Sequence, residues 1–260
     1  MHYSETAFVL PAKSPEAAAS VRIFTSSKEI PFAGHPTIGT AFLLASLGRA
    51  RLSTPENSLT LELGTGLVKV FVEVNDRNRG KAVMEQEVPQ SRGICTDLKT
   101  IAASLCLGAD EIASLEPEVF TNGVSFLIVC MKSLASIKKI SPNALLLEEL
   151  LRGLKVDGLV CFTTETIESS SHVHVRAFFP ELGVNEDAAT GAAQGPLAAY
   201  LFKNGLIRSE RNFRLVSEQG YEIGRPSRLT TTFDIRNGTI DAIKVSGDVL
   251  LMARGEFLLK

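Results

Sequence analysis

The sequence has no long hydrophobic segment, no excess of one charge and no paired cysteines. No uninterrupted apolar run exceeds six residues, as at positions 126–131, whereas a membrane-spanning helix needs about 20. Lysine and arginine number 27 against 29 aspartates and glutamates, which gives a net charge of −2. The sequence therefore excludes a helical integral membrane protein and offers no general attraction to nucleic acid or to anionic membranes.

The four cysteines are Cys95, Cys106, Cys130 and Cys161, and none of them forms a C-x-x-C pair. This spacing disfavours structural zinc and a disulfide framework, and it predicts reduced, mostly buried thiols. The first residues lack the basic and apolar segments of a signal peptide. We therefore expect a cytoplasmic protein without a metal or a disulfide.

The usual cofactor motifs are missing too. The chain has no P-loop, no G-x-S-x-G nucleophile motif and no complete dinucleotide fingerprint. Residues 64–66 (Gly-Thr-Gly) lie between two strand-like segments and no helix follows them. We interpret them as a hairpin turn rather than a phosphate loop. The sequence predicts no organic cofactor.

The composition is that of a globular protein, with 260 residues of which 45% are hydrophobic and 22% charged. This length fits one large domain or two small ones. Helices are predicted at residues 36–47, 97–105, 142–151 and 188–203. Strands, which are more numerous, are predicted at residues 6–10, 21–24, 59–63, 67–74, 126–131, 158–162, 172–179, 212–216, 228–234, 239–245 and 249–253.

Two of the predicted helices are nearly free of charge and resemble each other. With an offset of 157 positions, four pairs of residues match, namely Gly34 and Gly191, Ala41 and Ala198, Leu44 and Leu201, and Gly48 and Gly205. A helix that is apolar on all sides must be surrounded by protein. We therefore expect an α+β fold of two pseudo-symmetric lobes, each a curved, mostly antiparallel sheet around one central buried helix.

The division between the two lobes is expected near residue 88. The N-terminal lobe would cover residues 1–88 and the C-terminal lobe residues 89–260. The last predicted strand is the segment that could return to the N-terminal lobe.

Each charge-free helix begins beside a reactive side chain, His35 in the first and Asp187 just ahead of the second. Helix N-termini present unpaired N–H groups and partial positive charge, which suit carboxylates and developing oxyanions. If the two lobes face each other, both helix ends can point into one cleft. The structural alternative is that Asp187 is an N-cap and His35 a hydrogen-bonded group at a turn.

Three further polar residues carry weaker signals. Glu5 precedes an apolar strand and would by default be a surface residue. His172 and His174 alternate along one predicted strand and so share a face. Because no third ligand is evident, a solvated or partly buried strand face is a better interpretation than a metal site.

Several motifs occur in a fixed order along the chain. They are Ser-Glu-Thr-Ala-Phe-Val at 4–9, Pro-Phe-Ala-Gly-His-Pro-Thr-Ile-Gly-Thr-Ala at 31–41, Arg-Ala-Phe-Phe-Pro at 176–180, Gly-Val-Asn-Glu-Asp-Ala-Ala-Thr-Gly-Ala-Ala at 183–193, and Gln-Gly followed by Gly-Arg-Pro-Ser at 219–227. In these motifs, over nearly its whole length, the chain resembles the PhzF-like proteins of phenazine biosynthesis.

The resemblance implies a diaminopimelate-epimerase-like fold and a homodimer. It also implies an isomerase that moves a proton on a small carboxylate-bearing metabolite, without a cofactor, in the cleft between the lobes. Glu5 would be the principal proton-transfer residue, with His35 and Asp187 as the other catalytic residues. Four residues are expected to contact the substrate: Gly34, Thr190, Gly191 and Ala192.

Three features depart from the family pattern. Ala188 stands where the family usually has proline. Ala192 stands where it often has serine, which removes a hydroxyl donor at the start of the second helix. Family members also carry a strand and a helix ahead of the Ser-Glu-Thr motif, so the first lobe is expected to be short at its start.

Two other functions remain open on the sequence alone. One is an amino-acid epimerase or racemase on the same fold, although the related two-base enzymes use a cysteine at each helix start and this chain has His35 and Asp187 there. The other is a non-catalytic metabolite-binding protein that kept the cleft, which the short start and Ala192 favour.

Overall fold

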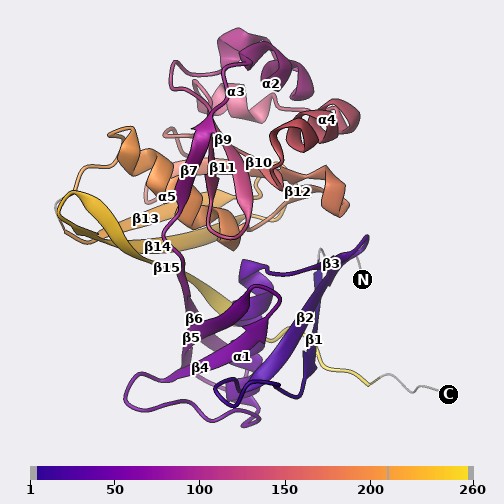
Figure 1. Ribbon diagram of the computed structural model, residues 1–260, viewed down its shortest axis with the longest axis vertical. Helices are drawn as coiled ribbons and strands as arrows, with labels where there is room; N and C mark the ends of the chain where they lie inside the picture. The colour runs from indigo at the N-terminus through magenta and orange to yellow at the C-terminus, as the bar shows by residue number, and fades with distance from the viewer. Residues whose placement is uncertain (1–4, 210, 257–260) are drawn as a thin grey trace.

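The computed structural model describes residues 5–209 and 211–256, which form the two lobes seen one above the other in Figure 1. In the lower, N-terminal lobe the strands surround one helix, α1 (Gly34–Ser46). The strands of this lobe are β1 (Glu5–Leu10), β2 (Ala19–Thr25), β3 (Glu29–Ile30), β4 (Ser58–Leu63), β5 (Gly66–Val74) and β6 (Arg79–Gln86).

The upper, C-terminal lobe holds the remaining helices of the described residues. Its strands are β7 (Gln90–Ile94), β8 (Glu118–Thr121), β9 (Ser125–Cys130), β10 (Gly158–Thr163), β11 (Val173–Phe179), β12 (Val184–Asp187), β13 (Phe213–Gln219) and β14 (Ser227–Arg236). Its helices are α2 (Leu98–Ser104), α3 (Leu134–Lys138), α4 (Ala144–Leu154) and α5 (Gln194–Lys203), with 3₁₀ turns η1 (Ala109–Glu111), η2 (Pro180–Leu182) and η3 (Gly191–Ala193).

One strand, β15 (Thr239–Leu250), joins the two lobes. Residues 239–246 of β15 pair with β14, and residues 243–250 pair with β6. The described strands therefore form a single sheet in the order β1-β2-β4-β5-β6-β15-β14-β13-β11-β10-β9-β8-β7, with β3 beside β2 and β12 beside β11.

The two central helices, α1 and α5, are buried, as expected for helices that carry almost no charge. In α1, Ala41 and Phe42 are almost fully buried against β4, β5 and β6. In α5, Leu197, Ala198 and Tyr200 are fully buried among β8, β9, β14 and β15. A helix with small and apolar residues on every side can be enclosed by a curved sheet without burying a charge. The predicted α+β architecture is confirmed.

The internal repeat extends to the backbone at the ends of these helices. Gly48 and Gly205 both adopt left-handed φ values, 65° and 69°, just beyond the last helical turn. In each case the N–H of the following residue bonds back to an equivalent leucine carbonyl, that of Leu44 at 2.8 Å and that of Leu201 at 3.0 Å. The offset of 157 positions therefore relates the two helix ends in hydrogen bonding as well as in sequence.

The C-terminal lobe is a three-layer structure. Helix α5 covers one face of its sheet, and α2, α3 and α4 cover the other. The neighbouring parallel strands β9 and β10 are buried along their whole length. Strands covered on both faces are uniformly apolar, which explains the run at residues 126–131.

Three predicted elements are wrong in detail. Residues 239–245 and 249–253 were expected as two strands, but β15 continues from 239 to 250 because Gly247 and Asp248 pair with Ala82 and Lys81 of β6. The helix expected at residues 188–203 begins later, with η3 at Gly191. Residues 188–190 are held outside the helix by side-chain hydrogen bonds that belong to the site.

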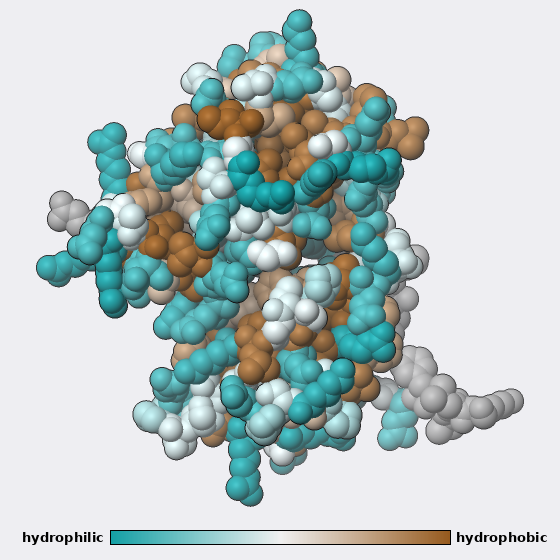
Figure 2. Space-filling model, in the orientation of Figure 1, coloured by the Kyte–Doolittle hydropathy of each residue, from teal (hydrophilic) through white to brown (hydrophobic). Residues whose placement is uncertain are grey.

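The surface agrees with the nearly neutral composition. Figure 2 shows hydrophilic side chains over most of the visible face, with hydrophobic groups in separate patches on both lobes. In the part of the chain that the structure describes, none of the helices combines the length and the hydropathy of a membrane span.

Candidate active site

One pocket, partly open to solvent, is lined by residues from both lobes and has a cavity volume of about 60 Å³. Its apolar wall includes Phe32 from the N-terminal lobe and Phe126 and Phe179 from the C-terminal lobe. All seven site residues predicted from the sequence also line it: Glu5, Gly34, His35, Asp187, Thr190, Gly191 and Ala192.

The starts of the two buried helices meet at this pocket. A Cβ atom added to Gly34 would lie 3.0 Å from both the Ala192 nitrogen and the Gly191 Cα. A Cβ added to Gly191 would lie 3.4 Å from the Gly34 Cα. Only glycine lets two backbones approach this closely. The contact brings the N–H groups and partial positive charges of both helix starts to one place.

Glu5 and His35 form an ion pair in the pocket. The His35 Nε2 lies 3.0 Å from the Glu5 Oε2, and the Glu5 side chain is only 10% exposed, against 41% for His35. Glu5 is therefore not the surface residue that a strand end would have by default. Strand β1 supplies the carboxylate and the first turn of α1 supplies the imidazole.

The pKa of His35 is raised above its ordinary value. Burial by itself lowers the pKa of this imidazole, but the hydrogen bond to Glu5 and the charges of Glu5 and Asp187 outweigh burial. The charge of Arg225 acts in the opposite direction. A protonated His35 in turn favours the ionised form of Glu5, which is the form that can accept a proton.

Asp187 is the last residue of β12 and is buried. Its Oδ2 accepts a hydrogen bond from the Thr190 hydroxyl at 2.8 Å. The Gln219 side chain donates to the Asp187 carbonyl at 2.8 Å and to the Thr190 hydroxyl oxygen at 2.9 Å, and it accepts from the Thr190 N–H. Asp187 is thus not a helix N-cap but part of a buried network that shapes residues 187–190.

Two side-chain amides fix the peptides at the start of the second helix. The Gln86 amide donates to the Gly191 carbonyl at 2.9 Å, and the Asn122 amide donates to the Ala192 carbonyl at 3.3 Å. In a planar trans peptide the next N–H points opposite to the carbonyl. The N–H groups of Ala192 and Ala193 therefore point away from these amides.

The sequence interpretation missed two of these residues, Gln86 and Asn122, and left two others, Gln219 and Arg225, without a role. Gln86 and Asn122 reach the site from 105 and 70 positions away in the chain, and neither belongs to a motif. Gln219 and Arg225 lie in one of the motifs quoted above, which was their only signal. Arg225 lines a neighbouring groove, which shares Val184 with the pocket.

His174 of β11 differs from the expected solvated or partly buried face, whereas His172, the residue just before β11, agrees with it. His172 is exposed, but His174 is fully buried between two glutamates. Within residues 5–209 and 211–256 no group of three or more His, Cys, Asp or Glu side chains is arranged to hold a metal ion. Ser4, part of the Ser-Glu-Thr motif, lies outside the described residues.

Comparison with known proteins places the chain in a family. The model of phenazine biosynthesis-like proteins (PhzC-PhzF) matches residues 1–255. The chain belongs to this family. It is 31% identical over 259 residues to the trans-2,3-dihydro-3-hydroxyanthranilate isomerase of Pseudomonas chlororaphis, an alignment that covers all of this chain and 86% of that enzyme.

Solved structures of family members agree with the fold. A PhzF-family phenazine biosynthesis protein from Bacillus anthracis superimposes with a TM-score of 0.82 at 26% identity, over 96% of this chain and 83% of that one. A predicted epimerase from Pseudomonas aeruginosa gives a TM-score of 0.79 at 31% identity, over 99% and 85%. Curated relatives of the chain are named as isomerases, and the protein itself is an isomerase.

Proposed function

We propose that the protein is a cofactor-independent isomerase that moves a proton on a small carboxylate-bearing metabolite bound in the pocket described above. The observation that carries this proposal is the meeting of the Glu5–His35 pair and Asp187 beside two helix N-termini in contact. Such a site combines groups that transfer protons with groups that bind negative charge.

Glu5 is the proposed base, and it removes a proton from a carbon next to a conjugated or carbonyl-bearing centre. Its low exposure and its partner His35 hold the carboxylate in one place. Proton transfer by a positioned carboxylate accelerates a reaction by about a hundred- to ten-thousand-fold. The proton then returns to a different carbon, from Glu5 itself or from Asp187 as the second carrier.

The negative charge that develops on the substrate needs compensation when no cofactor takes it up. We assign this to His35 and to the main-chain N–H groups at Gly34 and Ala192. Thr190 and Gly191, whose own N–H donates to the Ala189 carbonyl at 3.2 Å, shape the same wall of the pocket. Preorganised donors of this kind stabilise a developing anion by about 3–4 kcal/mol each. The substrate carboxylate would occupy the same cradle.

The test uses trans-2,3-dihydro-3-hydroxyanthranilate, which the names of two relatives identify as their substrate. The compound is incubated with the protein in D₂O and followed by proton NMR, beside a panel of amino acids and other small carboxylates. Isomerisation with deuterium at carbon supports the proposal. Deuterium at the α-carbon of an amino acid, with inversion of that carbon, would instead indicate an epimerase. Binding without any exchange would indicate a non-catalytic binding protein.

Further proposals concern the organisation of the molecule. We propose a lobe boundary at residues 88 and 89, in the segment between β6 and β7, with β15 returning to the N-terminal lobe. This is supported by the pairing of β15 with β6. A cytoplasmic homodimer acting on a small molecule is proposed from the family resemblance, with sedimentation analysis as the test of the dimer.

A further inference from the structure

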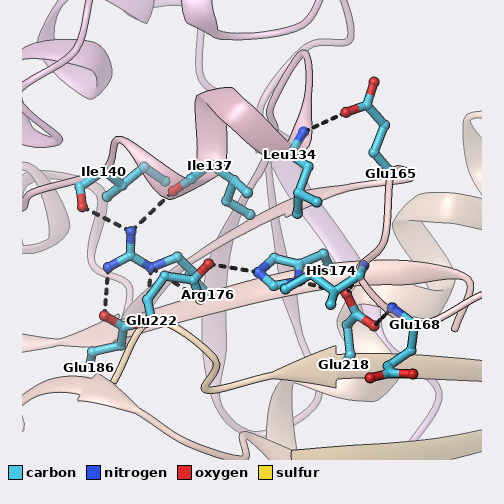
Figure 3. Close-up of polar contacts among 11 residues, drawn as sticks. Leu134, Ile137, Ile140, Glu165, Glu168, His174, Arg176, Glu186, Glu218 and Glu222 are labelled. Carbon is cyan, nitrogen blue, oxygen red and sulfur yellow. Dashed lines mark hydrogen bonds and ion pairs between the residues drawn. The ribbon is translucent and has the colours of Figure 1, made fainter. Parts of the chain in front are cut away.

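A buried charged layer lies in the C-terminal lobe between α3 and the strands β11, β12 and β13 (Figure 3). This charged layer consists of His174 and Arg176 from β11, Glu186 from β12, Glu218 from β13, and Glu222 from the turn after β13. The proposed mechanism uses none of these five side chains. Charges are removed from water in a protein only when they are paired, and breaking one such pair is costly.

His174 is the centre of the layer, with a fully buried side chain. Its Nδ1 lies 2.8 Å from Glu218 and its Nε2 lies 3.0 Å from Glu222. Only a protonated imidazole can donate to both carboxylates. Burial alone lowers the pKa of His174, but the two glutamates outweigh burial and raise it.

Arg176 is the second cation and holds β12. Its guanidinium forms a double hydrogen bond with Glu186, at 2.9 and 2.6 Å. Its remaining nitrogen donates to the carbonyls of Ile137 and Ile140, at 3.0 and 2.8 Å, which lie at the end of α3. A guanidinium that donates two parallel hydrogen bonds to a carboxylate fixes the position of that carboxylate more tightly than a single hydrogen bond does.

The sheet places the charged layer back to back with the active site. Successive residues of a strand point to opposite faces. Asp187 pairs with Ala177 and Gln219 with Val175, two core residues on the α5 face. Glu186 and Glu218, each one residue earlier in its strand, point to the opposite face, into the charged layer.

The turn after β13 makes a second connection to the site. Glu222 lies in this turn, which spans residues 220–225. Gly220 packs on the segment next to Asp187, because a Cβ added there would lie 2.9 Å from the Ala188 carbonyl oxygen. The same turn ends at Arg225, whose charge acts on His35. If Glu222 is released, the turn loses its buried anchor.

We propose that His174 and Arg176 are positioning residues for this enzyme: through Glu186, Glu218 and Glu222 they hold Asp187, Gln219 and the turn at 220–225 in the geometry of the active site. The proposal rests on the assignment of Asp187 to the site. It makes the site sensitive to the charge of His174, since a neutral imidazole cannot donate to both carboxylates. Glu218 then keeps the N–H groups of Ile167 and Glu168, and Glu222 keeps the more distant Arg176 at 4.0 Å.

Other charged groups around His174 are few. Tyr221 packs against the imidazole with ring centres 5.7 Å apart, and its hydroxyl lies 3.5 Å from Glu168. Arg176 lies 4.0 Å from Glu222 and is already engaged by Glu186. Tyr221 carries no positive charge, and the guanidinium of Arg176 is bound by Glu186. The positive charge that balances Glu218 and Glu222 therefore comes mainly from His174.

The test compares His174→Gln with His172→Gln, a matched control two residues earlier, just before β11. His172 is exposed, accepts a hydrogen bond from the Val216 N–H and packs edge-on against Phe213, without a carboxylate partner in these contacts. Hydrogen–deuterium exchange is measured for peptides covering residues 187–193 and 220–226 between pH 6 and 9, corrected for intrinsic exchange. In parallel, kcat and KM are measured between the same pH limits.

The expected result has a pH signature. In the parent, protection of both peptides is full at low pH and is lost as pH rises through the raised pKa of His174. His174→Gln shows reduced protection at every pH, and its kcat falls about ten- to a hundred-fold while KM changes less. His172→Gln matches the parent. Equal exchange and equal kcat in the two variants would overturn the proposal.

A second pair of variants covers the case in which His174→Gln does not fold. Glu222→Gln leaves His174 with one carboxylate, so the loss of protection is expected at lower pH than in the parent. Glu165→Gln, an exposed glutamate that caps α3 at the Leu134 N–H, is the control and leaves the profile unchanged. An identical profile in Glu222→Gln and Glu165→Gln contradicts the proposal.

Exchange is measured without substrate, so a parent without isomerase activity would refute the proposed function while this test still decides the positioning role.

Discussion

At the scale of single residues, the site is governed by three charges around one imidazole. Glu5 and Asp187 raise the pKa of His35, and Arg225 lowers it. The ion pair with Glu5 therefore contributes its stability below the ordinary pKa of histidine, about 6.5. That contribution is lost as pH rises through the raised value of the folded protein. Ligand binding that needs a protonated His35 should weaken over the same interval.

Substitution of Glu5 and substitution of Arg225 should move the pKa of His35 in opposite directions. We expect Glu5→Gln to lower the pKa, because the hydrogen-bonded anion is lost, and Arg225→Gln to raise it, because an opposing cation is lost. The measurement is NMR titration of the imidazole, assigned with His35→Gln. A pKa that stays the same in Glu5→Gln would show that the ion pair does not exist in solution.

Ala192 is the residue at which the pocket departs from the family pattern. Its side chain is buried at the pocket wall, beside the amide-fixed start of the second helix. We expect Ala192→Ser to add one hydrogen bond to a bound carboxylate and to tighten its binding by about three- to ten-fold. Calorimetric titration with the substrate or its product measures this. Weaker binding, with the melting temperature unchanged, would exclude a carboxylate at this position.

The sequence allowed the charged and glycine residues of the pocket to be predicted, but not their supports. His35 and Asp187 stand out because each lies at the start of a helix without charges. Glu5 was identified through the family resemblance alone. Gln86 and Asn122 have no local signal, since amides on strands and turns are common. Their role depends on a pairing of distant segments that only the folded chain brings together.

At the scale of elements, the decisive feature is the contact between the starts of α1 and η3. We expect Gly34→Ala to destabilise the protein by about 1–3 kcal/mol, because the added Cβ is forced against the Gly191 and Ala192 backbone. Gly39→Ala, in the same helix with nothing near its Cβ, should stabilise by about 1 kcal/mol. Urea unfolding of both variants measures the difference. A Gly34→Ala variant as stable as Gly39→Ala would show that the helix starts do not touch.

Element boundaries were predictable where local patterns and pairing agree. The hairpin turn at residues 64–66 and the run in β9 follow from local composition. The full length of strand β15 does not follow from local composition. Gly247 and Asp248 have low strand propensity and are held extended by pairing with β6. Strands β6 and β12 were not predicted for the same reason, since each is defined by its neighbours rather than by its own residues.

At the scale of the whole molecule, the continuous sheet predicts cooperative unfolding of both lobes. Met84 is fully buried in β6, opposite Val70 of β5 and Val245 of β15. We expect one calorimetric transition in the parent, and a single transition at lower temperature in Met84→Ala, which should lose about 2–5 kcal/mol. Two transitions, with only one of them moved by Met84→Ala, would show that the lobes unfold independently.

The central claim is that Glu5 moves the proton. Its most direct test is the rate of isomerisation and of deuterium incorporation from D₂O, measured for the parent and for Glu5→Gln on the same substrate. Glutamine keeps the shape of Glu5 but cannot accept a proton, so a rate lower by about a hundred- to ten-thousand-fold is predicted. Circular dichroism and ligand binding should remain those of the parent. A folded Glu5→Gln protein that retains more than about a tenth of the parent rate would contradict the account.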